Sequence, residues 1–227
     1  MDQIVLYNYF RSSTSYRVRI GLHHKKIDFL YYPIHLLKNG GEQHSPEYRK
    51  ISPLGEVPTL VHTVTPTDRR VIGQSLPILE YLEEVFPQNP LLPKDLYLKA
   101  KVRQFCENVN AFMHPLGNLK VLQHLEADHG FDQAKKETWV QHWLTQGFTA
   151  LEHMIKAESK IFALSDEITM ADLFLAPQIF TARRFKVDMK KFARVLELED
   201  KYTSIKAFQD AHPSRQMDTP EEERSKG

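Results

Sequence analysis

Short apolar runs separated by proline and glycine fill the first ninety residues of the chain. Four of these runs are rich in strand-forming residues and are bounded by turn formers or proline, which predicts four strands of one small sheet. The four runs cover residues 4–7, 29–34, 59–64 and 71–72.

The segment between the first two runs, SSTSYRVRIGLHHKK, carries two conflicting signals. Apolar and polar residues alternate from Tyr16 to Leu22, a pattern that taken alone suggests a strand. The length of the segment and the Ser-Thr cluster at its front favour a capped helix instead. We therefore expect the chain to begin β-α-β.

Helical periodicity dominates the rest of the chain. The stretch GQSLPILEYLEEVFP gathers its apolar residues on one face and predicts a helix. Apolar residues then recur at steps of three and four over residues 98–113 and 140–155, which predicts two long amphipathic helices. Thr169 and Asp172 have the spacing of a capping box and predict a further helix, within which Pro177 would cause a kink.

The change from mixed to helical patterning predicts two domains. We expect residues 1–87 to form an α/β domain and residues 95–227 an all-helical one. Residues 88–94, rich in proline and polar groups, are predicted to be a linker. The tail from His212 onward is polar and ends in EEERSKG, so we expect it to be poorly ordered at its end.

Composition is that of an ordinary globular protein, with 41% hydrophobic and 26% charged residues. Thirty Lys and Arg stand against 29 Asp and Glu, so we expect no nucleic-acid or membrane partner. No apolar run approaches the ~20 residues of a membrane span. The start MDQIVLYNYFRSS lacks a signal-peptide pattern, and the single cysteine fits a reducing compartment, so we expect a cytoplasmic protein.

Several kinds of chemistry lack their signatures in this sequence. It has no GxGxxG and no GxxxxGK[ST], which argues against dinucleotide and P-loop sites. Although the chain has 11 histidines, it has no HExxH, and we expect no metal site. Cys106 falls on an apolar helical stripe, which favours a buried structural thiol over a nucleophile.

The first candidate site is the segment from Arg11 to Ser15, between a predicted strand and a predicted helix. A helix amino end offers unpaired N–H groups and a positive dipole, and nearby hydroxyls can donate to the same negative charge. The segment therefore suits an activated sulfur. The alternative is that its hydroxyls only cap the helix.

Two further candidates follow later in the chain. A cis Val57–Pro58 bond would free the Val57 backbone to meet a ligand, whereas the alternative is an ordinary trans proline at a sheet edge. Gln74 and Ser75 open a predicted helix. The Ser75 hydroxyl and the next N–H groups could hold a carboxylate, or Ser75 could be a plain cap.

The motifs YFRSSTSYRVRIGL, GEVPTL, GQSLPILEYLEE, ITMADLFLAPQ and RRFKVDM, in this order, closely resemble the zeta class of glutathione transferases and maleylacetoacetate isomerases. The resemblance covers nearly the whole chain, including HPSRQMDTPEE near the end. It implies an α/β thioredoxin-like amino-terminal domain and an all-α carboxy-terminal domain, which together make the glutathione transferase fold. It also implies a homodimer.

The resemblance implies a catalytic role for the first candidate segment. Ser13 would be the hydroxyl that stabilises the thiolate of glutathione, with Ser12 and Thr14 as its neighbours in the site. Zeta proteins usually have cysteine where this chain has Thr14, so any role of that sulfur in orienting substrate or in covalent modification is lost.

The resemblance also implies the residues that bind glutathione. Val57, before a cis Pro58, would pair with the cysteinyl backbone, and Gln74 and Ser75 would hold the γ-glutamyl carboxylate. His114 stands where a glutamine that contacts glutathione is expected, so that contact is predicted to be altered.

The implied activity is glutathione-dependent cis-trans isomerisation of maleylacetoacetate to fumarylacetoacetate, a step of phenylalanine and tyrosine catabolism. A thiolate adds to the cis double bond, the resulting single bond rotates, and elimination regenerates glutathione, which is therefore a cofactor. Because the substrate is a dicarboxylate, Arg11 and Arg184 are predicted to anchor its carboxylates. For each arginine the alternative is an ordinary salt bridge.

Three other functions stay open at this point. Maleylpyruvate isomerase uses the same chemistry on a shorter diacid, and a transferase of the same class could act on small α-halo acids. A non-catalytic binding module with the same fold is the third. Thr14 and His114 keep that last alternative open, while retention of Ser13 together with Val57-Pro58 and Gln74-Ser75 argues against it.

Overall fold

The computed structural model describes residues 2–224, which form two compact units. The first unit holds the residues up to Pro90 together with those from Thr203 onward, and the second is Leu91–Tyr202. This grouping differs from the predicted helical domain of residues 95–227, because the last part of the chain belongs with the sheet.

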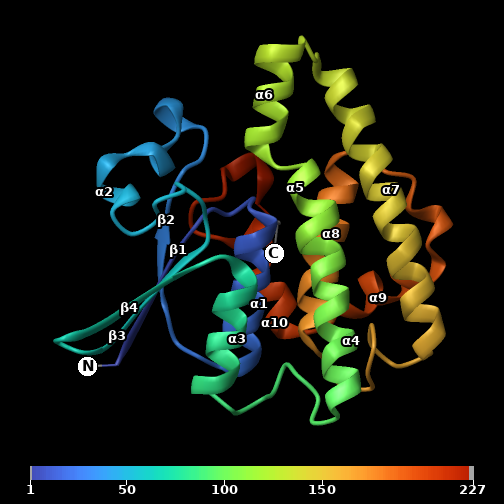
Figure 1. Cartoon of the computed structure of the whole chain (residues 1–227), viewed down its shortest axis with the longest axis horizontal. Helices are drawn as coiled ribbons and strands as arrows, with labels where there is room; N and C mark the ends of the chain where they lie inside the picture. Colours follow the sequence, from blue (N-terminus) through green and yellow to red (C-terminus); the bar gives the residue numbers. More distant parts are fainter. Residues whose placement is uncertain (1, 225–227) are drawn as a thin grey trace. The chain divides into compact units, whose positions relative to one another are not determined.

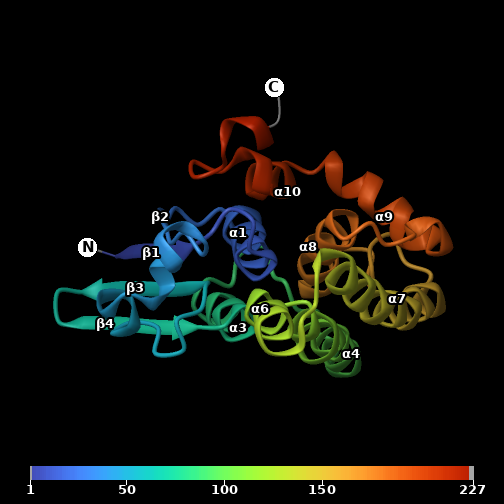
Figure 2. The same cartoon turned by 90° about the horizontal axis from the view of Figure 1, so that it is seen from above.

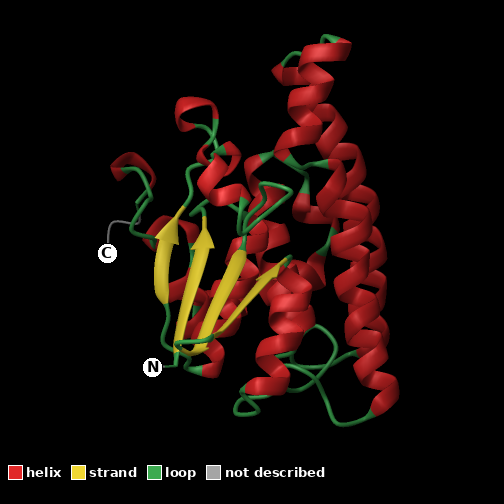
Figure 3. Ribbon diagram, turned by 60° about the vertical axis from the view of Figure 1, so that its left-hand side comes forward, coloured by secondary structure: helices red, strands yellow, loops and turns green. Residues whose placement is uncertain are grey.

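The first unit is built on a four-stranded mixed sheet (Figure 3). Its strands are β1 (Gln3–Asn8), β2 (Leu30–Pro33), β3 (Thr59–Thr65) and β4 (Asp68–Gly73). They lie in the order β2-β1-β3-β4, in which only β1 and β2 are parallel. The four predicted strands are confirmed. The last begins earlier than predicted, because the β3–β4 pairing extends past a register shift at Thr63 and Thr65 to Asp68.

Helix α1 (Ser13–Lys25) joins β1 to β2 and confirms the predicted β-α-β start. Every residue from Ser13 to Leu22 is buried, because α1 contacts α3 (Ser75–Val85) on one side and α10 (Lys206–Ala211) on another. Figures 1 and 2 both show α1 beside these helices. A helix buried all round has no polar face, so the sequence carried no helical periodicity there.

The carboxy-terminal residues belong to this unit through contacts with α1. The Tyr16 hydroxyl donates to the Phe208 carbonyl at 3.3 Å, and Arg19 Nε donates to the Ala211 carbonyl at 3.0 Å. Since both acceptors are backbone carbonyls of α10, the side chains of that segment gave no sign of this docking. Of the end EEERSKG that we expected to be poorly ordered, Glu221–Glu223 form a 3-10 turn, while residues 225–227 lie outside the described residues.

The second unit is helical, as predicted. Its helices are α4 (Leu96–Glu107), α5 (His114–Leu116), α6 (Leu119–His129), α7 (Gln133–Glu158) and α8 (Met170–Arg184), followed by α9 (Ala193–Thr203) at the border of the first unit. The predicted apolar stripe over residues 140–155 is buried on α7, whereas the one over residues 98–113 is buried from Val102 onward and runs past the end of α4. An unpredicted π-helical turn, Asn108–Met113, continues α4.

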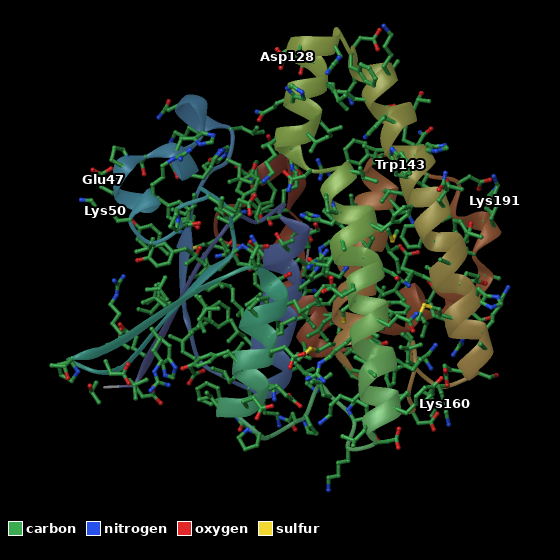
Figure 4. The ribbon with its side chains drawn as sticks, in the orientation of Figure 1. Glu47, Lys50, Asp128, Trp143, Lys160 and Lys191 are labelled. Atoms are coloured by element: carbon green, nitrogen blue, oxygen red, sulfur yellow. The ribbon has the colours of Figure 1, made fainter. Side chains whose placement is uncertain are left out.

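Glycine lets that π-helical turn approach α7. A Cβ at Gly147 would collide with the side chain of Met113, so a larger residue fits there only if Met113 moves. Trp143, one turn earlier on α7 (Figure 4), packs its ring 5.7 Å from that of Trp139 and 5.8 Å from that of Phe112. These contacts join α7 to the π-helical turn that leads into α5.

Helix α8 begins at the predicted capping box. The Asp172 carboxylate accepts a hydrogen bond from the Thr169 N–H at 2.8 Å, and it also accepts from the Ala163 N–H at 3.0 Å and the Tyr202 hydroxyl at 2.7 Å. The helix continues through Pro177 to Arg184. No helix in the described part of the chain is long and apolar enough to cross a membrane.

Candidate active site

The register of the sheet gathers three loops of the first unit at one end of its central strands. Thr59 pairs with Tyr7 on β1 and with Gly73 on β4. The chain entering β3 at Pro58 therefore lies between the chain leaving β1 toward Ser12 and the chain leaving β4 toward Gln74. The sequence candidates from these three segments are brought together.

A directed chain of hydrogen bonds runs through the start of α1. Ser12 caps the helix by accepting from the Ser15 N–H at 3.2 Å. The Thr14 hydroxyl donates its one proton to the Val57 carbonyl at 3.0 Å. The 2.9 Å contact between the Ser12 and Thr14 hydroxyls must then be a donation from Ser12. The hydroxyl protons of Ser12 and Thr14 are thus both committed.

The Val57–Pro58 peptide bond is cis, which confirms that prediction. The carbonyl of Glu56, just before it, accepts from the Tyr48 hydroxyl at 2.7 Å and from Ser52 Oγ at 2.9 Å. Burial raises the pKa of Tyr48, so its hydroxyl stays protonated and keeps donating. Hydrogen bonds from Tyr48 and Ser52 therefore fix the backbone of this loop.

Gln74 and Ser75 are held by two residues that sequence reasoning missed. Gln74 has a φ of 67°, and its side-chain amide donates to the Glu56 carboxylate at 2.8 Å. Ser75, only 1% exposed, accepts from the guanidinium of the fully buried Arg17 at 3.1 Å. Because an arginine can only donate, the Ser75 hydroxyl accepts in this bond and does not use its own proton in it. Both lie within motifs quoted above, Glu56 in GEVPTL and Arg17 in YFRSSTSYRVRIGL, but nothing in the local sequence pairs Arg17 with Ser75.

Arg11 lies in the loop between β1 and α1 and forms an ion pair with Glu223. Its guanidinium also sits 5.1 Å from the centre of the Phe10 ring. The fully buried Arg19 supports this loop by donating to the carbonyls of Tyr9 at 3.3 Å and Phe10 at 2.9 Å. Burial lowers the pKa of Arg19 to about 10, which leaves it charged at neutral pH.

His114 and Arg184 belong to the second unit, whereas the other candidates belong to the first. His114 opens α5, and its Nε2 lies 3.4 Å from the side-chain nitrogen of Asn118. Arg184 ends α8, with its guanidinium 5.7 Å from the centre of the Phe185 ring. Cys106 is fully buried on α4.

Residues 2–224 contain no cluster of three or more His, Cys, Asp or Glu side chains that could hold a metal ion.

Comparison with known proteins identifies the family. Residues 11–85 match the glutathione S-transferase N-terminal domain. The chain is 43% identical over 220 residues to the probable maleylacetoacetate isomerase 2 of Drosophila melanogaster, covering 97% of this chain and 92% of that one. The chain belongs to the zeta class of glutathione transferases and maleylacetoacetate isomerases.

Solved structures of zeta-class relatives share the whole fold. A holo maleylpyruvate isomerase, a bacterial zeta-class protein, superposes with a TM-score of 0.88 at 32% identity over 95% of this chain and all of its own. Maleylacetoacetate isomerase from Anaeromyxobacter dehalogenans, with dicarboxyethyl glutathione and citrate bound, gives 0.87 at 32% identity over 99% and 97%. The predicted thioredoxin-like domain followed by a helical domain is confirmed.

Proposed function

We propose that this zeta-class protein is a glutathione-dependent isomerase that converts maleylacetoacetate to fumarylacetoacetate. The observation that carries the proposal is the junction of the α1 amino end with the cis-proline loop, made by the hydrogen bond from Thr14 to Val57. The names of its relatives support the same reaction.

The residues at this junction fit glutathione. The Val57 backbone beside cis Pro58 would pair with the cysteinyl backbone, while Gln74 and Ser75 would hold the γ-glutamyl carboxylate at the amino end of α3. His114 of the second unit is proposed as a further contact. Bound glutathione supplies the thiolate that adds to the substrate's cis double bond and leaves after rotation.

Ser13 is the proposed donor to that thiolate. The family resemblance gives Ser13 this role, and Ser12 and Thr14 beside it use their hydroxyl protons on Thr14 and Val57. The position of Ser13 at the first turn of α1 adds the positive end of the helix dipole. Both effects lower the pKa of a thiol from about 8.5 toward neutrality.

The dicarboxylate substrate needs cationic anchors as well. Arg11, one residue before the Ser12 cap, is proposed to bind one carboxylate, and Arg184 to bind the other from the second unit. A guanidinium presents two parallel N–H groups to a carboxylate, which fixes its orientation as well as its charge.

The decisive experiment is isomerisation of maleylacetoacetate, or its analogue maleylacetone, followed by ultraviolet absorption with and without glutathione. We expect strict glutathione dependence. Ser13→Ala should lower kcat by at least ~10-fold and raise the pH at which the rate reaches half its maximum, since a thiol without its donor ionises later. A rate that does not depend on glutathione would refute the proposal.

Maleylpyruvate isomerase is the second candidate, because the structure of such an enzyme superposes on nearly the whole chain. Maleylpyruvate assayed in parallel separates the two, since a larger kcat/KM for the shorter diacid would favour this alternative. From the family resemblance we also propose a cytoplasmic homodimer that serves phenylalanine and tyrosine breakdown. Light scattering coupled to size-exclusion chromatography tests the dimer.

A further inference from the structure

The last described residues, 212–224, form a folded segment, which we call the C-terminal strap. Gln216 Nε2 donates to the His212 carbonyl at 2.7 Å, and the Thr219 hydroxyl donates to the Pro213 carbonyl at 2.5 Å. Arg224 Nε closes the end by donating to the Thr219 carbonyl at 3.0 Å. Thr219 is only 3% exposed, so the strap holds a defined position in the first unit.

The strap is attached to the loop that carries Arg11. One carboxylate oxygen of Asp218 accepts from the Phe10 N–H at 3.0 Å, and the other accepts from the Tyr31 hydroxyl. On the other side of the loop, Arg19 donates to the Phe10 carbonyl at 2.9 Å. The backbone before Arg11 is thus fixed between the strap and the buried face of α1.

Beyond Asp218, the strap places the Glu223 carboxylate on the Arg11 guanidinium. Glu223 Oε1 accepts a hydrogen bond from the NH2 group of Arg11. Arg11 Nε is buried and has no hydrogen-bond partner among the described residues. Glu223 therefore uses one of the two donors on this edge of the guanidinium. A carboxylate bound along the same edge in bidentate fashion would accept from both Nε and NH2.

We propose that Glu223 is a specificity-determining residue, whose carboxylate occupies the place of a substrate carboxylate on Arg11 and must exchange with it. The inference rests on the role proposed above for Arg11. The pair is partly exposed, with 28% of the Arg11 side chain and 39% of the Glu223 side chain accessible, so it is weak enough to be displaced. A diacid gains the second hydrogen bond that Glu223 leaves unmade.

Replacing Glu223 by glutamine tests the exchange. Glu223→Gln keeps the shape of the side chain and removes the competing charge, so the KM for the diacid should fall by about 2- to 5-fold, the range of a partly exposed ion pair. The KM for glutathione should not change. Glu221→Gln is the matched control, because it removes the same charge from the same 3-10 turn and the Glu221 side chain makes no hydrogen bond or ion pair among the described residues. An unchanged or higher diacid KM in Glu223→Gln would overturn the proposal.

Direct binding separates this inference from the isomerase proposal. Calorimetric titration of the glutathione-saturated protein with succinate needs no turnover, and Glu223→Gln should bind succinate about 2- to 5-fold more tightly. In an Arg11→Leu background, which has no cation for Glu223 and succinate to compete for, the gain from Glu223→Gln should disappear. Equal succinate affinity of wild type and Glu223→Gln, or no succinate binding by either, would overturn the exchange whatever the isomerase assay shows.

Discussion

The Thr14 hydroxyl donates to the Val57 carbonyl at 3.0 Å, and this bond joins the first turn of α1 to the cis-proline loop. Val57 is the residue proposed to pair with the cysteinyl backbone of glutathione, and Ser13 is proposed to face its sulfur. The Thr14 side chain therefore links the two segments of the proposed thiol site, the first turn of α1 and the cis-proline loop. Where the family usually has cysteine, this chain has a stronger donor to a carbonyl.

Removing that bond should weaken glutathione binding. Thr14→Val keeps the shape of the side chain and loses the donor, so the KM for glutathione should rise by about 2- to 10-fold, corresponding to one hydrogen bond of roughly 0.5–1.5 kcal/mol. Thr14→Ser keeps the donor and should behave like wild type. Steady-state kinetics at fixed diacid measures both, and equal KM values for the valine and serine variants would show that the bond has no role.

Ser75 is expected to contribute both to glutathione binding and to stability. Ser75→Ala removes a donor to the γ-glutamyl carboxylate, and hydrogen bonds to charged groups are worth roughly 1.5–3 kcal/mol, so binding should weaken by about 10- to 100-fold. It also takes an acceptor from the buried Arg17, so the free energy of unfolding should fall by about 1–3 kcal/mol.

A helix cap in the other unit separates those two effects. Asp132 caps α7 by accepting from the Lys135 N–H at 2.8 Å, and Asp132→Ala should lower the free energy of unfolding by about 1 kcal/mol. Its affinity for glutathione, measured by calorimetry, should equal that of wild type. If Asp132→Ala weakened glutathione binding as much as Ser75→Ala does, the effect at Ser75 would be one of stability alone.

Local chemistry explains which parts of the site could be predicted from the sequence. Ser12, Pro58 and Ser75 were found because a helix cap and an X-Pro bond are properties of neighbouring residues. Arg17 and Glu223 were missed because their partners are 58 and 212 positions away along the chain. The same reason applies to the strap, whose polar composition gave no sign that its side chains bond to backbone groups of the strap and of the loop before Arg11.

The activity should resist alkylation of thiols. Cys106, the chain's one cysteine, is fully buried, and position 14, where the family resemblance led us to expect a cysteine, is a threonine. Protein treated with N-ethylmaleimide and then desalted should keep its activity. Thr14→Cys places a thiol at a helix amino end, where its pKa is lowered, and should be inactivated by the same treatment. Equal rates of inactivation for both proteins would mean that Cys106 is reached and matters for activity.

The stability of the strap should depend on pH through His212. Burial lowers the pKa of His212, and the charges of Arg19 and Arg215 lower it further. Its Nδ1 accepts from the Ser214 N–H at 3.2 Å, which requires that nitrogen to be unprotonated. Between the folded pKa and about 6.5, the unfolded chain binds the proton more strongly than the folded one. The contribution of His212 is therefore complete above about pH 6.5 and is lost as pH falls toward the folded pKa.

The variant His212→Asn tests this dependence, because asparagine can still cap the turn but does not titrate. Urea unfolding from about pH 7.5 to about pH 5 should show a smaller loss of stability in the variant than in wild type. The pKa of His23 is also lowered by burial, but that residue is present in both proteins, so the difference between the two curves isolates His212. If the strap alone loosens first, the proteolytic cleavage of residues 212–224 should accelerate at low pH in wild type only. Parallel curves for the two proteins would show that His212 stays neutral throughout this range or that its cap does not stabilise the fold.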